Sequence, residues 1–335
     1  MSSAYGIIGF GQALGEAYKV EDEISKYTTN IDKIKSWGYK YFYVAPPEVS
    51  QSDLAFKASK EALKNSGMNA EDIDYIALAI SEVPEHMYWD PACELQHKLG
   101  ANRAEVQVFN QACTSGLMAF DAIAGKFAIH PEYKNVLIVT ANRFCDNHKN
   151  RATYNAYLHS DGAVAAVIKR DHNYCKWITT ETASDGMYAP LLRNEWRVAV
   201  TPFSVENKST DTDNHSSPLS EVHAQLMDFY KLVHIRNRLV VEYACQKAGI
   251  ELSDLKKVIY LHDNENEMND FAIEFNIPVG QTNANLASQF SHMGASDQLI
   301  GLKYYLETGE LQNGDYVALI GIGSGMHWVC TLLQV

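Results

Sequence analysis

The segment from 105 to 128 changes its hydrophobic period in the middle. Residues 106–109 (VQVF) alternate apolar and polar positions, which predicts a strand, whereas apolar residues recur at helical spacing from Leu117 to Phe127. Cys113 lies at the junction, in the first turn of the predicted helix. Unpaired N–H groups and the helix dipole at that place favour a thiolate over a thiol. Cys113 is therefore a candidate nucleophile, although free cysteines are more often small buried hydrophobic residues.

The hydrophobic pattern of the first half of the chain returns in the second half. Residues 61–80 and 242–261 both predict a helix, a glycine after its last turn, a short loop and a buried strand, and their glycines, Gly67 and Gly249, stand 182 residues apart. Residues 136–143 (VLIVTANR) match residues 317–324 (VALIGIGS) at an offset of 181. These matches indicate an internal repeat.

The junction that holds Cys113 has its own counterpart in residues 289–305. The chain is therefore predicted to be two fused copies of one α/β unit, residues 1–170 with the nucleophile and residues 171–335 after them. Each copy alternates strands with helices, which predicts a mixed or mostly parallel sheet covered by helices. The polar stretch at about 200–225 falls outside the match and is predicted to be a loop or lid.

Composition and charge narrow the classes of protein. The 335 residues are 46% hydrophobic, which is enough for a large core. A formal net charge of -13 and the absence of a basic stripe argue against a nucleic-acid or anionic-membrane partner. No uninterrupted apolar run approaches the roughly 18 residues that a membrane helix needs, and no charged segment precedes the first apolar residues as in a signal peptide. We therefore expect a cytoplasmic protein.

The six cysteines show neither a Cys-x-x-Cys pair nor the spacing of a metal finger. A chain of this length does not depend on disulfides for its stability. We expect no disulfide, no structural metal and no resident cofactor.

Seven motifs in order along the chain resemble those of the thiolase superfamily, specifically β-ketoacyl-ACP synthase III and its relatives. The resemblance covers nearly the whole chain and implies a five-layered αβαβα fold, usually in a homodimer. In that family a cysteine accepts an acyl group from a CoA or carrier-protein thioester. The motifs are YGIIGFGQALGE (5–16), DLAFKASKEALKNSG (53–67), NQACTSGLMA (110–119), HSDGAVAAVI (159–168), YLHDNEN (260–266), SHMGASDQLIGL (291–302) and GIGSGMHWVCTLL (321–333).

The resemblance implies a role for Cys113 as the nucleophile. Its backbone N–H, together with that of Ser324, would form an oxyanion hole for the tetrahedral intermediate. Glycines in the closing motif would let the backbone approach the acyl thioester closely, because they lack a Cβ. These are Gly321, Gly323 and Gly325.

Two histidines complete the candidate site. His262 ends a predicted buried strand, like the catalytic histidine of the family, and is a candidate base. His292 stands where synthase III enzymes usually carry an asparagine, so the set resembles the elongating ketosynthases, in which two histidines stabilise an enolate. Asp263 either orients the imidazole of His262 or is a solvated loop residue, and we favour the solvated interpretation.

Arginines near the predicted tunnel mouth are candidates for binding CoA. Arg143 and Arg151 are placed there by the resemblance, and Arg151 is the candidate contact to phosphate or adenine; the alternative is an ordinary surface arginine. The basic cluster that usually follows the first helix is replaced by residues 36–49, which keep Lys40. This weakens the expectation that an acidic carrier protein docks there and leaves CoA as the other donor.

Three functions remain open on the sequence. The first is decarboxylative condensation of a Cys113-bound acyl group with a malonyl-type acceptor, in fatty-acid-like or secondary-metabolite biosynthesis. The second is transfer of that acyl group to an alcohol or amine, which needs a base at His262 but no decarboxylation. The third is a non-catalytic partner subunit of a ketosynthase heterodimer, against which the intact Cys113 and His262 argue. His292 favours the first.

Overall fold

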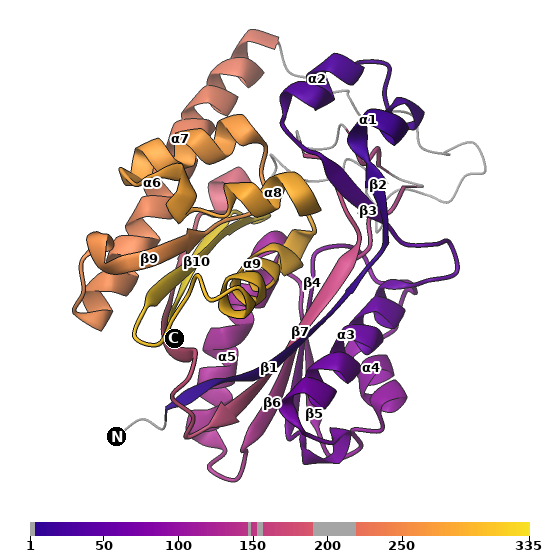
Figure 1. The fold of residues 1–335 in the computed structure, drawn as a ribbon, viewed down its shortest axis with the longest axis vertical. Helices are drawn as coiled ribbons and strands as arrows, with labels where there is room; N and C mark the ends of the chain where they lie inside the picture. The colour runs from indigo at the N-terminus through magenta and orange to yellow at the C-terminus, as the bar shows by residue number, and fades with distance from the viewer. Residues whose placement is uncertain (1–3, 147–148, 153–156, 190–218) are drawn as a thin grey trace.

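A computed structural model describes residues 4–146, 149–152, 157–189 and 219–335 (Figure 1). Its main feature is a nine-stranded sheet in the order β5-β4-β6-β7-β1-β8-β11-β10-β9, beside a two-stranded sheet of β2 and β3. The strands are β1 (Tyr5–Leu14), β2 (Glu16–Lys19), β3 (Tyr41–Val44), β4 (Tyr75–Ile80), β5 (Glu105–Phe109), β6 (Asn135–Asn142), β7 (Gly162–Arg170), β8 (Lys176–Ser184), β9 (Leu255–Ile259), β10 (Tyr316–Gly323) and β11 (His327–Gln334).

The nine strands form two half-sheets. A single residue pair, Gly6 with Lys176, joins β1 to β8. Strand β4 is parallel to β5 and β6, and β9 is parallel to β10, while the remaining pairs are antiparallel. Each half therefore has the mixed pairing that alternating strands and helices predict.

Helices cover both faces of the half-sheets and fill the space between them (Figure 1). Apolar residues of α3 and α4 pack on one face of the first half-sheet, α5 and α9 pack between the two half-sheets, and α6 and α7 pack on the outer face of the second. The helices are α1 (Val20–Glu23), α2 (Ile31–Ser36), α3 (Gln51–Ser66), α4 (Pro91–Leu99), α5 (Ser115–Ile129), α6 (Leu219–Ala248), α7 (Glu265–Phe275), α8 (Ala284–Phe290) and α9 (Asp297–Glu307). The layered αβαβα arrangement confirms the predicted fold class.

Short 3₁₀ turns link the layers. They are η1 (Ile24–Lys26), η2 (Ala70–Asp72), η3 (Ala112–Thr114), η5 (Gly186–Tyr188), η6 (Leu252–Asp254), η7 (Val279–Gln281) and η8 (Gly294–Ser296). Two of them, η3 and η8, directly precede the central helices α5 and α9, and they bring the functional segments together.

The predicted repeat is visible in the order of the elements. Helices α3 and α6 are each followed by a glycine, Gly67 with φ 67° and Gly249 with φ 71°, a conformation that favours glycine. Strand β4 then corresponds to β9, and β6 to β10. The predicted lid at 200–225 lies outside the described residues as far as residue 218, after which α6 begins.

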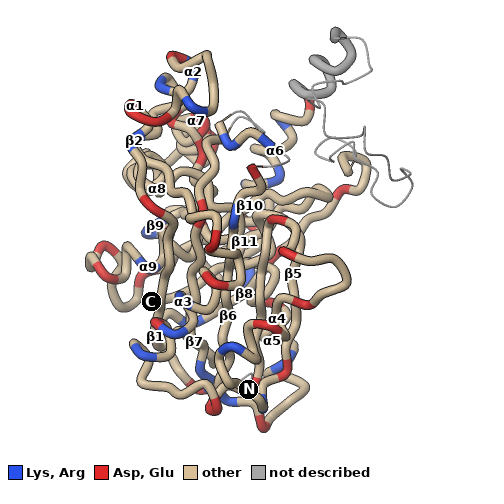
Figure 2. Tube along the Cα trace, turned by 90° about the vertical axis from the view of Figure 1, so that its right-hand side faces the viewer, with Lys and Arg blue, Asp and Glu red and all other residues tan. Residues whose placement is uncertain are grey.

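The central helix is strongly apolar. Within the part of the chain that the structure describes, Ala112–Ile129 alone is long and apolar enough, by length and composition, to cross a membrane. Its residues Leu117, Phe120 and Ile123 are buried in the core between the half-sheets. Acidic and basic residues are both spread over the trace (Figure 2). All six cysteines are free thiols.

Candidate active site

Cys113 lies in η3, one short turn before α5 and not in the first turn of α5 itself. The chain enters this turn through Ala112, whose φ of 52° is unusual for a residue with a Cβ. The Ser115 hydroxyl accepts a hydrogen bond from the Gln111 N–H at 2.7 Å and lies 2.9 Å from the carbonyl oxygen of Ile80, at the end of β4. The turn that carries Cys113 is thus tied to the sheet.

His292 faces the sulfur of Cys113. Its Nε2 atom is 3.2 Å from the Cys113 Sγ atom, and its Nδ1 atom is 2.6 Å from Asp297 Oδ2. The imidazole, the carboxylate and the sulfur therefore form a hydrogen-bonded Cys-His-Asp arrangement, in which a third group orients the base. The structure brings together the predicted Cys113 and His292 and adds Asp297, which the motifs did not single out.

Asp297 is the hub of the site. It is fully buried as the first residue of α9, where its Oδ1 accepts the Met293 N–H at 2.7 Å and its Oδ2 accepts the His262 N–H at 2.8 Å. Burial alone would raise the pKa of this carboxyl, but His262 and His292 outweigh burial and hold the pKa below its usual value. Asp297 is therefore a carboxylate at neutral pH.

The same contacts set the charge of His292. Burial disfavours the imidazolium, but Asp297 and the Cys113 sulfur outweigh burial and raise the pKa of His292 well above its usual value. The ring then carries a proton at both nitrogens. A positively charged N–H facing sulfur favours a thiolate, which is the reactive form of a cysteine.

His262 has the opposite character. It is fully buried, and burial lowers its pKa, so the ring is neutral. Its Nδ1 atom is 3.0 Å from the carbonyl oxygen of Ser291. Because a carbonyl oxygen only accepts, we assign the ring proton to Nδ1. The buried Nε2 has no hydrogen-bond partner among the residues that the structure describes, and it presents a lone pair. His262 can accept a proton there.

The closing motif packs against the nucleophile turn. A Cβ at Gly323 would lie 2.3 Å from the carbonyl oxygen of Gln111 and 2.5 Å from the Thr114 hydroxyl, so only glycine fits. Gly325 has a φ of 146°, another conformation that requires glycine. Ser324 lies between them and is exposed. The role of its N–H in an oxyanion hole stays a prediction.

Arg151 does not line the site. Its side chain is fully buried, and its guanidinium forms ion pairs with Asp146 and Asp161. The Nε of Arg143 donates to the carbonyl oxygen of Val49 at 2.7 Å. The expectation that Arg151 contacts substrate is therefore wrong: two carboxylates take up its charge, and it holds the loop before β7 in place.

Asp263 is not a solvated loop residue either. Its side chain is buried, and its Oδ1 accepts the backbone N–H of Asn264 at 2.7 Å and the Asn264 amide at 3.1 Å. The solvated interpretation is wrong because side chains from distant segments close over this position. The carboxylate that contacts the imidazole of His292 is Asp297.

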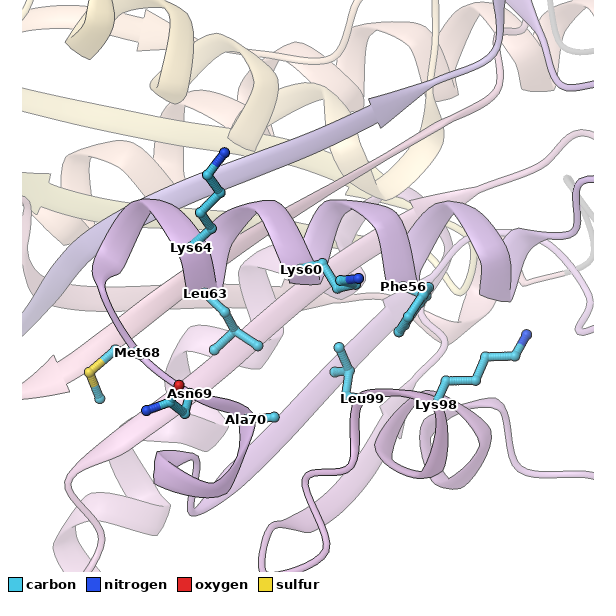
Figure 3. A pocket seen from close by; sticks show the side chains of 9 residues that line it. All are labelled: Phe56, Lys60, Leu63, Lys64, Met68, Asn69, Ala70, Lys98 and Leu99. Atoms are coloured by element: carbon cyan, nitrogen blue, oxygen red, sulfur yellow. The ribbon is translucent and has the colours of Figure 1, made fainter.

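A hollow of about 330 Å³ lies elsewhere, on the outer layer of α3 and α4. Phe56, Leu63 and Leu99 point toward one another in it, whereas Lys64 and Lys98 point away from it (Figure 3). The apolar residues of these helices pack on the face of the half-sheet opposite to α5. The sheet therefore separates this hollow from Cys113, and it is not part of the candidate site.

Two parts of the chain match models of a known protein family. The model of 3-oxoacyl-[acyl-carrier-protein] synthase III matches residues 109–186, and the model of its C-terminal part matches residues 245–335. Together they cover about half of the chain and include Cys113, His262, His292 and Asp297. The chain belongs to the synthase III family. It is an enzyme of the acyltransferase class, as the family resemblance implies.

Known proteins match over the full length. The beta-ketoacyl-[acyl-carrier-protein] synthase III of Syntrophomonas wolfei is 28% identical over 336 residues, covering 98% of this chain and 96% of the relative. Among solved structures, the acyltransferase ChlB3 has a TM-score of 0.84 at 22% identity, covering 99% of this chain and 98% of that one. The synthase III of Aquifex aeolicus has a TM-score of 0.79 at 23% identity, covering 99% and 100%. The two structures establish the fold.

Proposed function

We propose that this synthase III family member loads an acyl group onto Cys113 and condenses it with a malonyl-type acceptor. The observation that carries the proposal is the Cys113–His292–Asp297 arrangement, which pairs sulfur with an imidazolium. The relatives named beta-ketoacyl-ACP synthase III support the condensing reaction. Malonyl condensation places the protein in fatty-acid-like or secondary-metabolite biosynthesis, and we place it in the cytoplasm.

Loading begins with attack of the Cys113 thiolate on the thioester carbonyl of the donor. The new carbon–sulfur bond forms, the oxyanion is held by the backbone N–H groups of Cys113 and Ser324, and the donor sulfur leaves. The departing thiolate takes its proton from solvent, because Asp297 keeps the proton on His292. The donor is a CoA or carrier-protein thioester.

Condensation uses the same groups. Loss of carbon dioxide from the malonyl thioester leaves an enolate, whose oxygen accepts a hydrogen bond from the Nε2–H of His292. The enolate carbon attacks the acyl carbonyl, the new carbon–carbon bond forms, and the bond to the Cys113 sulfur breaks. The thiolate is regenerated beside its imidazolium, so protons and electrons balance over the cycle.

A second candidate function follows from the tautomer of His262. Its free Nε2 presents a lone pair and no N–H, so it is suited to remove a proton from a hydroxyl or amine acceptor. In that reaction the acyl group leaves Cys113 for oxygen or nitrogen, and His262 takes the proton. The structural similarity to the acyltransferase ChlB3 is consistent with both functions, because it concerns the fold alone.

One experiment separates the two functions. The acyl-enzyme is given a malonyl thioester labelled in its free carboxyl group, or a panel of alcohols and amines, and labelled carbon dioxide is counted. We expect one carbon dioxide for each acyl group consumed, with none from Cys113→Ala. Discharge of the acyl group to an alcohol or amine with no carbon dioxide from any malonyl thioester would replace condensation with simple acyl transfer.

We also propose a homodimer built on β5. This strand is the edge of the nine-stranded sheet, so its outer N–H and C=O groups are available to a second copy. Exposed apolar side chains of Val83, Met87 and Tyr88 lie on the loop between β4 and α4. Light scattering at micromolar concentration should give the mass of a dimer, and a monomer alone would count against the proposal.

A further inference from the structure

A tyrosine covers the catalytic imidazole. The ring of Tyr157 stacks on His292 with centroids 4.4 Å apart and planes inclined by 29°. The backbone fixes this placement, because the His292 N–H donates to Leu158 O at 2.9 Å and the Ser160 N–H donates to His292 O at 2.8 Å. The two segments run side by side as a parallel bridge at His159 and His292. Tyr157 is therefore held over the imidazole by the fold.

The hydroxyl of Tyr157 is held in turn by Asp263. This hydroxyl lies close enough to the buried carboxyl to act on its pKa as a hydrogen-bond partner. Burial and the neighbouring Glu267 raise the pKa of Asp263 to about 7, although the hydrogen bonds from Asn264 and Tyr157 favour its charged form. Asp263 also lies among the residues that line a hollow of about 290 Å³, with Trp37.

We infer that Tyr157, held by Asp263, is a positioning residue for His292. Two hydrogen bonds, to Cys113 and Asp297, fix the directions of the two ring nitrogens but leave the ring free to tilt about the line between them. The tyrosine face prevents that tilt, and its negative quadrupole stabilises an imidazolium over a neutral ring. The inference rests on the role of His292 in the proposed function.

Other titratable groups surround Tyr157, Asp263 and His292, and they also influence the charges of Asp263 and His292. Around Asp263 these are Tyr39, Tyr260 and Glu267; around His292 they are Cys113, Asp297, His262, His159 and Glu82. Substitution of Tyr157 or Asp263 leaves all of these in place. Changes in the reactivity of Cys113 then report the pair itself.

The test measures how fast iodoacetamide alkylates Cys113, followed at peptide level, from about pH 6 to about pH 9. Tyr157→Leu removes the ring and should slow alkylation near pH 6 by about tenfold, with a smaller loss near pH 9. Tyr157→Phe and Asp263→Leu break the hydrogen bond and should each slow it by about threefold. Asp263→Asn, whose amide oxygen still accepts the hydroxyl, should restore most of the rate.

Two controls separate positioning from a loss of structure. Exposed Cys93 reports general reactivity in every variant. Tyr133→Phe removes the same kind of contact, a 3.0 Å hydrogen bond to Glu105, at a distant surface, and should leave the Cys113 profile unchanged. If Asp263→Leu does not fold, Tyr157→Phe measured against Tyr133→Phe decides the question.

The double variant Tyr157→Phe with Asp263→Leu should be no slower than either single variant, because both break one interaction. Additive losses would overturn the inference, as would a wild-type profile in folded Tyr157→Phe or an Asp263→Asn variant as slow as Asp263→Leu. Alkylation needs no thioester. A failure of condensation would therefore leave this result unaffected, and failure here would leave the carbon dioxide measurement unaffected.

Discussion

The two halves of the molecule contain the same kind of junction, in which the first residue of a central helix bonds to the end of a strand and to the turn before the helix. We call each junction a corner, and the two corners differ in the chemistry of that first residue. In the first half, Ser115 begins α5 and joins the end of β4 to the approach to η3: its hydroxyl accepts the Gln111 N–H and contacts Ile80 O. This contact is neutral. It shapes the turn that carries Cys113 and adds no charge to it.

In the second half, Asp297 begins α9 and stands 182 residues after Ser115, which is the offset of the repeat. It accepts the N–H groups of Met293 and His262, which stand at the same offset from Gln111 and Ile80. A carboxylate can accept further hydrogen bonds, and Asp297 also accepts one from the imidazole of His292. The serine in the first half only shapes its turn, whereas the carboxylate in the second half also places a negative charge beside His292.

The largest expected effect comes from making the second corner like the first. Asp297→Ser keeps a side chain that bonds to the backbone but removes the charge beside His292. We expect acylation of Cys113 to slow by about 10²-fold or more, the scale for losing the group that orients a catalytic imidazole. Quenched-flow mass measurements of the acyl-enzyme test this, and a rate near that of the wild type would remove Asp297 from the mechanism.

The pH dependence of that variant gives the direction of the effect. Asp297 is one of the groups that raise the pKa of His292, so in Asp297→Ser the imidazolium is lost at a lower pH. Alkylation of Cys113 should then fall most near neutral pH and recover as alkaline pH ionises the thiol directly. A uniform loss at every pH would indicate a misplaced side chain and not a missing charge.

A smaller effect is expected in the first corner. Ser115→Ala leaves the partly buried Gln111 N–H and the buried Ile80 C=O without this partner, at a cost of about 1–3 kcal/mol in the free energy of unfolding. Urea denaturation measures this. Acylation by the folded variant should fall far less than in Asp297→Ser. An equal loss of activity in the two variants would contradict the division into a structural and an electrostatic corner.

Much of this account was present in the sequence, because motif and period are local signals. The change of period at Cys113 predicted a candidate nucleophile, and the motifs around His262 and His292 predicted both imidazoles. The repeat predicted two α/β units, and the family resemblance implied the layered fold. Asp297 was missed because acidic residues are common in the first turn of any helix, where the helix dipole favours a negative charge. Its alignment with Ser115 in the repeat was the signal that could have found it.

Burial could not be predicted from local pattern. Asp263 follows a buried strand in a polar segment, and its side chain is buried beside Tyr39 and Tyr157 from the other half of the chain. Arg151 was expected to be available to substrate, but it forms an ion pair with Asp161, ten positions further along the chain. For both side chains, the neighbouring groups determine whether the residue is available to substrate. Tertiary packing brings those groups together, so a local sequence pattern does not reveal them.

The most direct test is the mass of the intact protein after incubation with a panel of acyl-CoA and acyl-carrier thioesters. The account predicts a single acyl increment that peptide mapping assigns to Cys113, present in the wild type and absent in Cys113→Ala, while Cys93→Ala behaves as the wild type. An increment that persists in Cys113→Ala on another cysteine, or no increment with any donor, would contradict it.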